Sequence, residues 1–337
     1  MNPIYYDADA DLGVLEGMTI GVVGYGNQGR SQALNLRDSG LELIVGNIAD
    51  ESFDQARTDG FETMSIVEAC KRAQLVMLLV PDEVMPDVYA RDVAPYLKPG
   101  DVIDFASGYN VAFGLIKPTK EVDVIMIGPR MIGPGVRDTF VSGEGFPSFV
   151  GVHQDASGQA KARMLALAKG LGSTRAGCIE MSLHDEATLD LFTEQALAPA
   201  LGNMLITAVQ ILVDAGYPPE AVLLELYLSG EMIYAFEKIR EVGMNKQSEF
   251  HSRTSQYGSM TRGARFADVM GPISDLMKGV LQEIRSGAFA EEWSTDREKK
   301  LELLEELSKI RDALPLSQWE LQTRKAFKIG DAAESED

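Results

Sequence analysis

The chain has 337 residues, 45% of them hydrophobic and 24% charged, which is enough apolar material for a buried core and fits two domains. Its 31 basic and 51 acidic side chains give a formal net charge of −20. Such a charge repels phosphate backbones and anionic lipid, so we expect neither nucleic acid nor a membrane as a partner. No run of 18 apolar residues occurs, residues 1–7 do not resemble a secretory leader, and two cysteines exclude a disulfide framework. These features predict a soluble cytoplasmic protein.

Residues 18 to about 180 alternate short apolar runs with amphipathic segments. The runs are rich in branched residues and bounded by Gly, Pro or Asp, which is typical of strands buried on both faces of a parallel sheet; they cover 18–24, 41–45, 75–80, 102–105, 122–126 and 148–152. Helical patterns lie between them, one opening with a capping box from Ser65 to Glu68. The alternation predicts an α/β Rossmann domain with a doubly wound parallel sheet over residues 1–182.

From residue 183 to residue 329 the pattern is helical, and we expect an all-α domain. Four long stretches have a period near 3.6 residues: 185–215, 219–242, 260–287 and 294–312. We expect them to be separated by a Gly/Pro turn at 216–219, a polar stretch at about 248–258 and the glycine at 287. The acidic tail, 330–337, is predicted to be disordered.

A glycine-rich loop follows the first predicted strand directly and opens the first predicted helix. It consists of Gly24, Tyr25, Gly26, Asn27, Gln28 and Gly29. In this strand–turn–helix context the glycines permit a tight turn and a close approach of backbone to a pyrophosphate, and the helix N-terminus attracts the phosphates. The loop therefore predicts a dinucleotide cofactor, with a plain glycine turn as the alternative.

The loop after the second predicted strand is expected to meet the adenosine ribose. It contains Asn47, Asp50, Glu51 and Ser52, and no basic residue occurs between Gly46 and Arg57. An acidic group here accepts hydrogen bonds from a free 2′-hydroxyl and repels a 2′-phosphate. The loop favours NADH over NADPH; alternatively, Asp50 and Glu51 only cap a helix that starts near Ser52.

Asp190 and Glu194 lie four residues apart, on one face of a predicted helix with apolar neighbours. Two adjacent carboxylates against an apolar wall are costly unless a cation offsets them. Mg²⁺ is often held by one or two carboxylates and water molecules, so the pair predicts a magnesium site. The alternative is a solvated acidic face.

These motifs together resemble the ketol-acid reductoisomerases in their short, class I form, over nearly the whole chain. The glycine loop and the residues after it, up to Gly40, match the cofactor loop of that family almost residue for residue. Further similar segments are 5–12, 79–83, 150–158, 175–180, 190–195 and 252–258. Through the second of these, the resemblance also assigns Pro81 and Asp82 to cofactor binding.

The resemblance implies a Mg²⁺-dependent alkyl shift in a 2-acetolactate-type substrate, followed by hydride transfer from NAD(P)H. It also implies a Rossmann domain joined to a helical domain that interlocks with a second subunit, so that a homodimer shares its active sites. Asp190 would then bridge two metal ions and Glu194 would ligate one. Glu231 would match a metal-site carboxylate that reaches the partner subunit's site, and Ser252 would hydrogen-bond the substrate carboxylate.

The sequence departs from the family pattern at residues to which the resemblance assigns catalysis. Ser107 stands where the family has histidine, and Arg130 replaces a lysine with a guanidinium that does not titrate. Counting back from Ser252 puts the first glutamate of a later helix on Tyr227 and the second on Glu231. Counting forward from Glu194 puts them on Glu225 and Ser229 instead, so in either register one metal-site carboxylate is missing.

We therefore expect a reductoisomerase-like oxidoreductase whose alkyl-shift step is weakened or lost. Its substrate would be a 2-keto acid, a ketol acid or an imine, reduced by NADH or NADPH with Mg²⁺. Asp190, Glu194, Arg130 and Ser107 would be catalytic, and Glu231, Ser252 and Tyr227 would lie at the substrate. Two alternatives remain open: a genuine ketol-acid reductoisomerase acting on 2-acetolactate in branched-chain amino-acid biosynthesis, and a nucleotide-binding protein without turnover.

Overall fold

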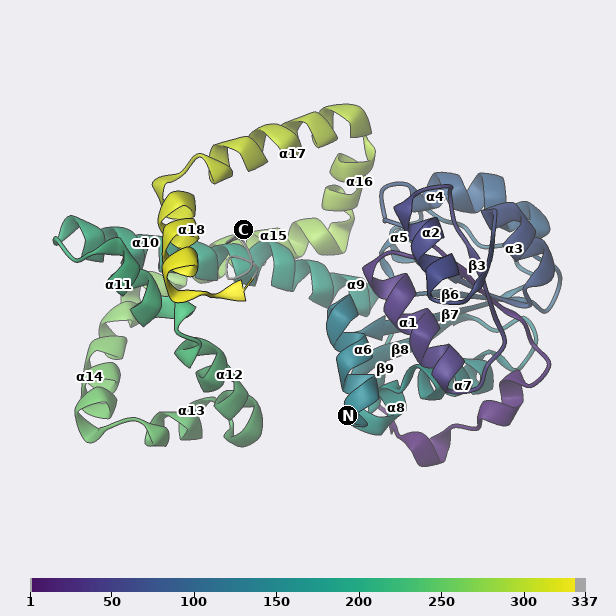
Figure 1. Cartoon of the computed structure of the whole chain (residues 1–337), viewed down its shortest axis with the longest axis horizontal. Helices are drawn as coiled ribbons and strands as arrows, with labels where there is room; N and C mark the ends of the chain where they lie inside the picture. Colours follow the sequence, from purple (N-terminus) through teal and green to yellow (C-terminus); the bar gives the residue numbers. More distant parts are fainter. Residues whose placement is uncertain (1, 331–337) are drawn as a thin grey trace. The chain divides into compact units, whose positions relative to one another are not determined.

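The computed structural model describes residues 2–330 and consists of two compact units, which meet in sequence between Asp190 and Leu191 (Figure 1). The first unit contains the whole sheet, and the second is helical. The predicted boundary, after residue 182, lies near the start of α9 (Leu183–Phe192), whose first turns pack in the first unit. The predicted disordered tail, apart from Gly330, lies outside the described residues.

The sheet of the first unit has the strand order β1-β9-β8-β7-β6-β5-β2-β3-β4. The strands from β7 to β4 in that order are parallel neighbours, as predicted. The strands are β1 (Ile4–Tyr5), β2 (Ile20–Val23), β3 (Leu43–Gly46), β4 (Glu62–Met64), β5 (Leu75–Leu78), β6 (Val102–Phe105), β7 (Asp123–Pro129), β8 (Ser148–Gln154) and β9 (Cys178–Glu180).

The expectation of an all-parallel sheet was wrong for its outer part, because β8 runs antiparallel to β7. The chain leaves β7 at Pro129, forms α6 (Gly133–Ser142) and returns at Ser148, which pairs with Pro129. Since the chain re-enters the sheet at the edge from which it left, the next strand must run backward. The Rossmann assignment is confirmed, with a mixed rather than purely parallel sheet.

Helices cover both faces of this sheet. Against one face pack α1 (Asn27–Asp38), α6 and α7 (Ala160–Leu171), and against the other α3 (Ile66–Arg72), α4 (Met85–Val88) and α5 (Tyr109–Ala112). The shorter α2 (Glu51–Thr58) and α8 (Ser173–Ala176) complete the unit. Because both faces are buried, the parallel strands carry apolar side chains on both sides, which is the pattern that made them predictable.

The helical unit has a small core of its own, where α10, α11 and α18 meet around Val209, Val222 and Leu223. Its helices are α10 (Ala198–Asp214), α11 (Pro219–Leu223), α12 (Glu231–Val242), α13 (Met244–Gln247), α14 (Arg253–Gly263), α15 (Ala267–Ser286), α16 (Ala288–Ser294), α17 (Arg297–Asp312) and α18 (Pro315–Phe327). The prediction of a non-helical stretch at 248–258 was wrong from residue 253 onward, where α14 begins. The Ser252 side chain caps this helix by accepting from the Ser255 N–H.

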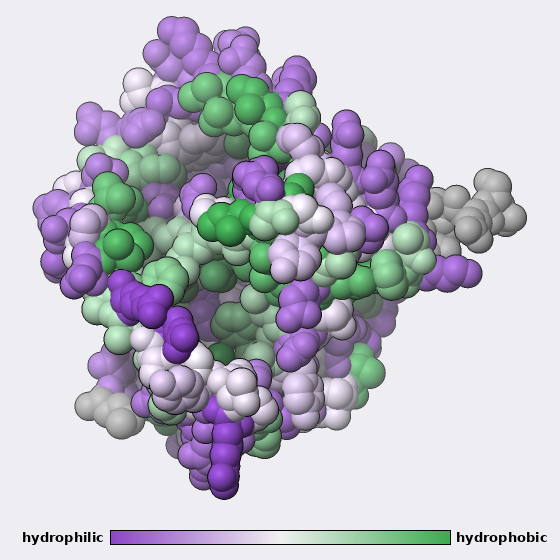
Figure 2. Space-filling view, turned by 90° about the vertical axis from the view of Figure 1, so that its left-hand side faces the viewer, coloured by the Kyte–Doolittle hydropathy of each residue, from purple (hydrophilic) through white to green (hydrophobic). Residues whose placement is uncertain are grey.

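Much of the apolar surface of the helical unit is uncovered (Figure 2). The helical run Leu183–Asp214 is by length and composition apolar enough to cross a membrane, and 11% of its most apolar window is buried inside the structure. Its apolar sequence is interrupted by Asn203, Thr207 and Gln210. A single such helix is a weak indication of a membrane span, and our expectation of a chain without one stays a prediction.

One buried carboxyl group stands out in the first unit. Asp104, in the middle of β6, is completely buried, and neither carboxylate oxygen has a hydrogen-bond partner among the described residues. Burial raises its pKa well above the ordinary value, an effect that the nearby N–H groups of Ile127 and Phe105 only partly offset. Burial therefore favours the neutral, protonated form of Asp104.

We predict that Asp104→Asn flattens the pH dependence of stability. A carboxyl whose pKa is raised by folding contributes its full stability below the unfolded pKa of about 3.9. Above that pH the free energy of unfolding falls by about 1.4 kcal/mol per pH unit until the pKa of the folded state is reached. Thermal unfolding at pH 5 and pH 8 should therefore show a larger fall in midpoint for the wild type than for Asp104→Asn. The exposed Asp138→Asn serves as control, and equal slopes for wild type and Asp104→Asn would contradict the prediction.

Candidate active site

The glycine loop connects β2 to α1 as predicted. Gly24 has a φ of 96°, a conformation that favours glycine, and Gly26 is the N-cap of α1. A Cβ atom on Gly29 would lie 2.0 Å from the carbonyl oxygen of Gly24, so only glycine permits this approach of helix and strand. Gly26 and Asn27 are exposed at the helix N-terminus, where their amides are available to a pyrophosphate.

Side chains on the adenosine side of the loop hold one another in place. The Tyr25 N–H donates to Asn47 Oδ1 at 3.3 Å, and Asn47 Nδ2 donates to Asp50 Oδ1 at 2.8 Å. The Tyr25 hydroxyl donates to Asp59, which also binds Arg30 through two nitrogens. Burial and the Asp59 carboxylate raise the pKa of Tyr25. The tyrosine is therefore neutral, and its hydrogen bond to Asp59 supports the loop.

Asp50 and Glu51 lie at the start of α2. The Asp50 carboxylate caps the helix by accepting from the Phe53 N–H at 3.0 Å, and Glu51 and Ser52 form its first turn. The alternative that these residues cap a helix is therefore confirmed for Asp50. The hydrogen bonds that Asp50 accepts from Asn47 Nδ2 and from the Phe53 N–H both end on Oδ1. Helix capping is therefore compatible with a contact between Oδ2 and the ribose.

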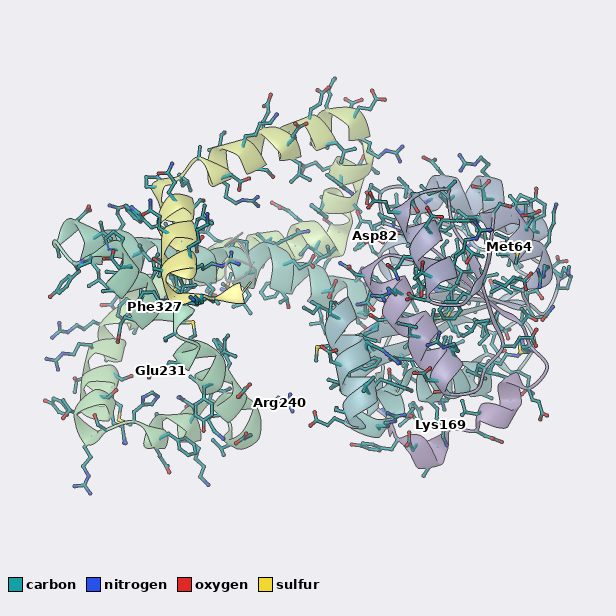
Figure 3. The ribbon with its side chains drawn as sticks, viewed as in Figure 1. Met64, Asp82, Lys169, Glu231, Arg240 and Phe327 are labelled. Atoms are coloured by element: carbon teal, nitrogen blue, oxygen red, sulfur yellow. The ribbon has the colours of Figure 1, made fainter. Side chains whose placement is uncertain are left out.

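On the other side of the loop, Pro81 and Asp82 follow β5 and are exposed (Figure 3). Asn110 Nδ2 donates to the Asp82 carbonyl at 3.3 Å and to its Oδ1 at 3.0 Å. The neighbouring Tyr109 hydroxyl is buried without a hydrogen-bond partner among the described residues, and burial raises its pKa to about 12. Because the carboxyl ends of β5 and β6 meet at one edge, this segment borders the place where a nicotinamide would lie.

A charged cluster forms where β7 ends against α9. Arg130 Nη2 donates to Glu186 Oε1 and Nη1 donates to Asp190 Oδ1, both at 2.8 Å. The guanidinium also donates to the Gly128 carbonyl and lies 4.7 Å from the centroid of the Phe149 ring. One cation thus holds two carboxylates from one helix, and the planar fork of arginine suits this geometry.

Glu186 is the site residue that our sequence reasoning missed. Its side chain is completely buried and its Oε2 accepts from the Gly108 N–H at 2.7 Å. Burial raises its pKa, while that hydrogen bond and Arg130 oppose the increase. The signal was present in the sequence, because Glu186, Asp190 and Glu194 recur every four residues and so share one helix face.

Ser107, which follows β6, lies at the same cluster. Its hydroxyl is 3.4 Å from Glu186 Oε2 and accepts from the Tyr109 N–H at 3.3 Å. A hydroxyl at 3.4 Å makes at best a weak hydrogen bond. Ser107 therefore borders Glu186 rather than replacing a titrating base, and its catalytic role stays a prediction.

We expect Asp190 and Glu194 on this helical run to hold a magnesium ion, and this assignment stays a prediction. Among residues 2–330 no three His, Cys, Asp or Glu side chains gather closely enough to hold a metal ion by themselves. Mg²⁺ accepts one or two carboxylates and keeps several waters, which Asp190 and Glu194 would supply. Between them α9 gives way to a π-helical turn, Thr193–Leu197, and such turns are frequent at functional sites.

Three further predicted residues lie in the helical unit. Glu231 is exposed at the start of α12 (Figure 3), and Ser252 is the N-cap of α14. Tyr227 and Glu225 lie in a second π-helical turn, Leu224–Leu228. The Tyr227 hydroxyl donates to Glu320 of α18 at 2.5 Å, and the Tyr227 side chain packs against the small core. These contacts are structural. Its assignment to the substrate, like those of Glu231 and Ser252, stays a prediction.

Two family models match most of the chain. One, described as acetohydroxy acid isomeroreductase, NADPH-binding domain, matches residues 14–177, and the other, described as ketol-acid reductoisomerase, C-terminal domain, matches residues 183–329. The chain belongs to the ketol-acid reductoisomerase family. It is an NAD(P)H-dependent oxidoreductase of that family.

Relatives of known name agree with the family assignment. A ketol-acid reductoisomerase (NADP(+)) of Pyrobaculum neutrophilum is 43% identical over 295 residues, covering 87% of this chain and 89% of the relative. The structure of an NADH-preferring ketol-acid reductoisomerase from an uncultured archean superposes with a TM-score of 0.90 at 32% identity, covering 96% and 98% of the two chains. The chain also resembles a 1-pyrroline-5-carboxylate reductase of Streptococcus pyogenes, with a TM-score of 0.53 at 16% identity, covering 80% of this chain and 98% of the reductase. At this identity the likeness shows a shared fold alone.

These comparisons give no support to a weakened or lost alkyl shift. They fit the alternative better, a genuine ketol-acid reductoisomerase, because the similarity to such enzymes covers both halves of the chain. The inference of loss rested on Ser107, on Arg130 and on a metal-site carboxylate that is missing in either register of the later helix. In the structure Arg130 still joins the predicted metal ligand Asp190 to the sheet edge, so the substitution preserves a cation at this position.

We predict that removing Arg130 is costly for folding. Arg130→Ala leaves the Glu186 carboxylate buried without its cation, which should lower the free energy of unfolding on the order of 3 kcal/mol. Adding Glu186→Gln should recover at least half of the loss, because a neutral amide needs no counter-ion. Urea unfolding of the wild type, of Arg130→Ala and of the double variant measures both effects. Arg30→Ala, which breaks a more exposed ion pair, should cost about 0–1 kcal/mol, and a similar cost for Arg130→Ala would contradict the prediction.

Proposed function

We propose that the protein is a ketol-acid reductoisomerase that converts 2-acetolactate or a close analogue with NADH and Mg²⁺. The observation that carries this proposal is the ion pair between Arg130 and Asp190, which lies at the edge of the sheet where the carboxyl ends of the parallel strands meet. A dinucleotide loop ends at the same edge. The proposal thus combines a reductant site and a carboxylate site in one unit.

The side chains of the cluster have distinct tasks in this proposal. Arg130 holds Asp190 and Glu186 in one orientation, and the Gly108 N–H fixes the second oxygen of Glu186. Ordered carboxylates need little reorganisation when the substrate binds. When bound, Mg²⁺ supplies the Lewis acidity that polarises a carbonyl and stabilises an alkoxide during an alkyl shift. The glycine loop would hold the pyrophosphate and so anchor the cofactor for the reduction that follows.

We propose NADH as the preferred reductant. Asp50 and Glu51 place negative charge at the start of α2, and no lysine or arginine lies between Gly46 and Arg57 to bind a 2′-phosphate. The structural relative named as NADH-preferring supports this choice, although the Pyrobaculum relative is named for NADP(+).

We also propose that a second copy of the chain covers the helical unit, forming a homodimer with shared active sites. The uncovered side chains are large and apolar, and include Leu201, Met204, Ile206 and Ile211 on α10 and Ile233, Tyr234 and Phe236 on α12. Exposed apolar surface of this extent marks an interaction site. Sedimentation equilibrium should give twice the mass of the chain, and a monomer at micromolar concentration would exclude the dimer.

We place the enzyme in the cytoplasm. Cys70 and Cys178 are both buried free thiols, and burial raises the pKa of each to about 12. Unpaired cysteines fit a reducing compartment.

We predict that 2-acetolactate drives NADH oxidation only when Mg²⁺ is present, and that Asp190→Asn abolishes most of this activity. Loss of a metal-holding carboxylate should remove several kcal/mol of transition-state stabilisation, on the order of 10²–10³-fold in kcat/KM. Asp214→Asn, at the other end of the same helical run, is the control and should be active. Reduction of the rearranged acid, 3-hydroxy-3-methyl-2-oxobutyrate, without turnover of 2-acetolactate would sink the proposal.

We predict that Asp50→Ser with Glu51→Arg moves the preference toward NADPH. Serine keeps the N-cap of α2, and arginine adds a partner for the 2′-phosphate. One charge-assisted contact should raise the ratio of kcat/KM for NADPH over NADH about tenfold or more. Asp54→Arg, an exposed position on the same helix, controls for charge alone. An unchanged ratio in the double variant would show that this loop does not select the cofactor.

A further inference from the structure

The Arg130 side chain folds back along the strand from which it comes. Its backbone N–H donates to the Pro147 carbonyl at 2.9 Å, which fixes the main chain at the end of β7. From there Nε donates to the Gly128 carbonyl at 3.2 Å. The two terminal nitrogens bind α9, one at Asp190 and the other at Glu186. The orientation of the guanidinium plane therefore determines which carboxylate each nitrogen reaches.

Gly128 leaves room for this guanidinium. A Cβ atom at this position would lie 3.0 Å from Arg130 Nη2 and 3.1 Å from Glu186 Oε1. Gly128 pairs with Phe149 in the antiparallel ladder between β7 and β8. Residues that stand directly opposite each other in such a ladder extend their side chains from the same face of the sheet. The guanidinium therefore lies close to the position that a side chain of Gly128 would take, next to the Phe149 ring.

The Phe149 ring is suited to fix the plane of the guanidinium. The Arg130 Cζ atom lies over this ring, 4.7 Å from its centroid. The ring is itself held in place, because Phe149 is partly buried against the apolar core between the sheet and the helices α3 and α4. A guanidinium is planar and stacks on aromatic faces, whereas an ammonium group is a point charge without a plane. A ring below the guanidinium therefore restricts its tilt.

The start of α9 lies in direct contact with this part of the sheet. A Cβ on Gly108 would lie 2.1 Å from the Leu183 carbonyl oxygen, and a Cβ on Gly151 would lie 2.3 Å from the Met181 carbonyl oxygen. Phe149 and Gly151 are two residues apart on β8 and so belong to the same face. Because α9 begins against this face, the guanidinium must reach both carboxylates from one position.

We propose that Phe149 is a positioning residue for the reaction: its ring fixes the plane of the Arg130 guanidinium, and Arg130 in this plane holds Asp190 in the orientation in which it binds Mg²⁺. Phe149 acts through Arg130 alone. This inference rests on the proposed function, which assigns the metal ion to Asp190. It gives the antiparallel direction of β8 a consequence for the site, because this direction and register place Phe149 opposite Gly128.

Phe149→Leu tests the assignment, because it removes the ring and keeps an apolar side chain in the sheet. Mg²⁺ alone, titrated into the full-length chain by calorimetry, should bind about threefold to tenfold more weakly, the loss expected for one cation–π contact. The kcat for 2-acetolactate with NADH should fall by a similar factor, and the Kd for NADH should not change. Phe149→Tyr keeps the ring and should stay within about twofold of the wild type in all three quantities.

Tyr96→Leu is the matched control. Tyr96 is partly buried against the same apolar core as Phe149, and the Lys71 ammonium lies 5.1 Å from the centroid of its ring. Loss of this ring should change none of the three quantities.

A second comparison introduces Arg130→Lys, which keeps a cation beside Glu186. In this background Phe149→Leu should change the Kd for Mg²⁺ by about twofold or less, because an ammonium has no plane for the ring to fix. Thermal unfolding checks that each variant is folded at the assay temperature. Phe149→Met, which also lacks the ring, replaces Phe149→Leu if the leucine variant is unfolded.

Three results would overturn the assignment. The first is a Kd for Mg²⁺ and a kcat that stay within about twofold of the wild type in Phe149→Leu. The second is a lower unfolding midpoint as the only change, because this indicates a structural role. The third is an equal loss with and without Arg130→Lys, because the ring would then not act through the guanidinium.

Failure of the proposed function gives a different result. A wild-type chain that binds Mg²⁺ but does not turn over 2-acetolactate would overturn the proposed function, while the Mg²⁺ titrations still decide the role of Phe149. A wild-type chain that does not bind Mg²⁺ would overturn both.

Discussion

The arrangement of the site depends on the two ion pairs that Arg130 makes with Glu186 and Asp190. They attach the first turns of α9 to the end of β7. Glu186 is fully buried, and a buried carboxylate is tolerated only with a partner and hydrogen bonds. Since Asp190 lies one turn beyond Glu186 on the same helix, the partner that neutralises one carboxylate also orients the other. A folding requirement and the proposed arrangement of the active site thus depend on one side chain, Arg130.

Local electrostatics, rather than net charge, explains how an acidic chain can bind an anionic dinucleotide. The formal charge of −20 creates a repulsive field at a distance, which salt screens within about 10 Å. At the glycine loop the amides at the start of α1 offer hydrogen bonds and a positive dipole end, which act over the first turn only. The acidic start of α2 lies on the adenosine side, where a free ribose hydroxyl needs an acceptor.

The strands that were predicted and those that were missed differ in burial and length. β2, β5 and β6 are buried along their whole length, so their apolar runs are visible in the sequence. β1, β4 and β9 have only two or three residues, several of them exposed, and they form by pairing with a neighbouring strand rather than by their own pattern. The direction of β8 was likewise not a local property, because it follows from where the chain re-enters the sheet.

The sequence by itself determined the family, the glycine loop, the helical second half and the pairing of Asp190 with Glu194 on one helix face, because turn chemistry and helical periodicity act over a few neighbouring residues. Only the tertiary structure decided that Arg130 joins Glu186 and Asp190, 56 and 60 residues away. The register of the later carboxylates could not be counted, because the chain between Glu194 and Ser252 differs in length from the family pattern by about two residues. Contacts between distant residues depend on how strands and helices pack, and no local pattern encodes that packing.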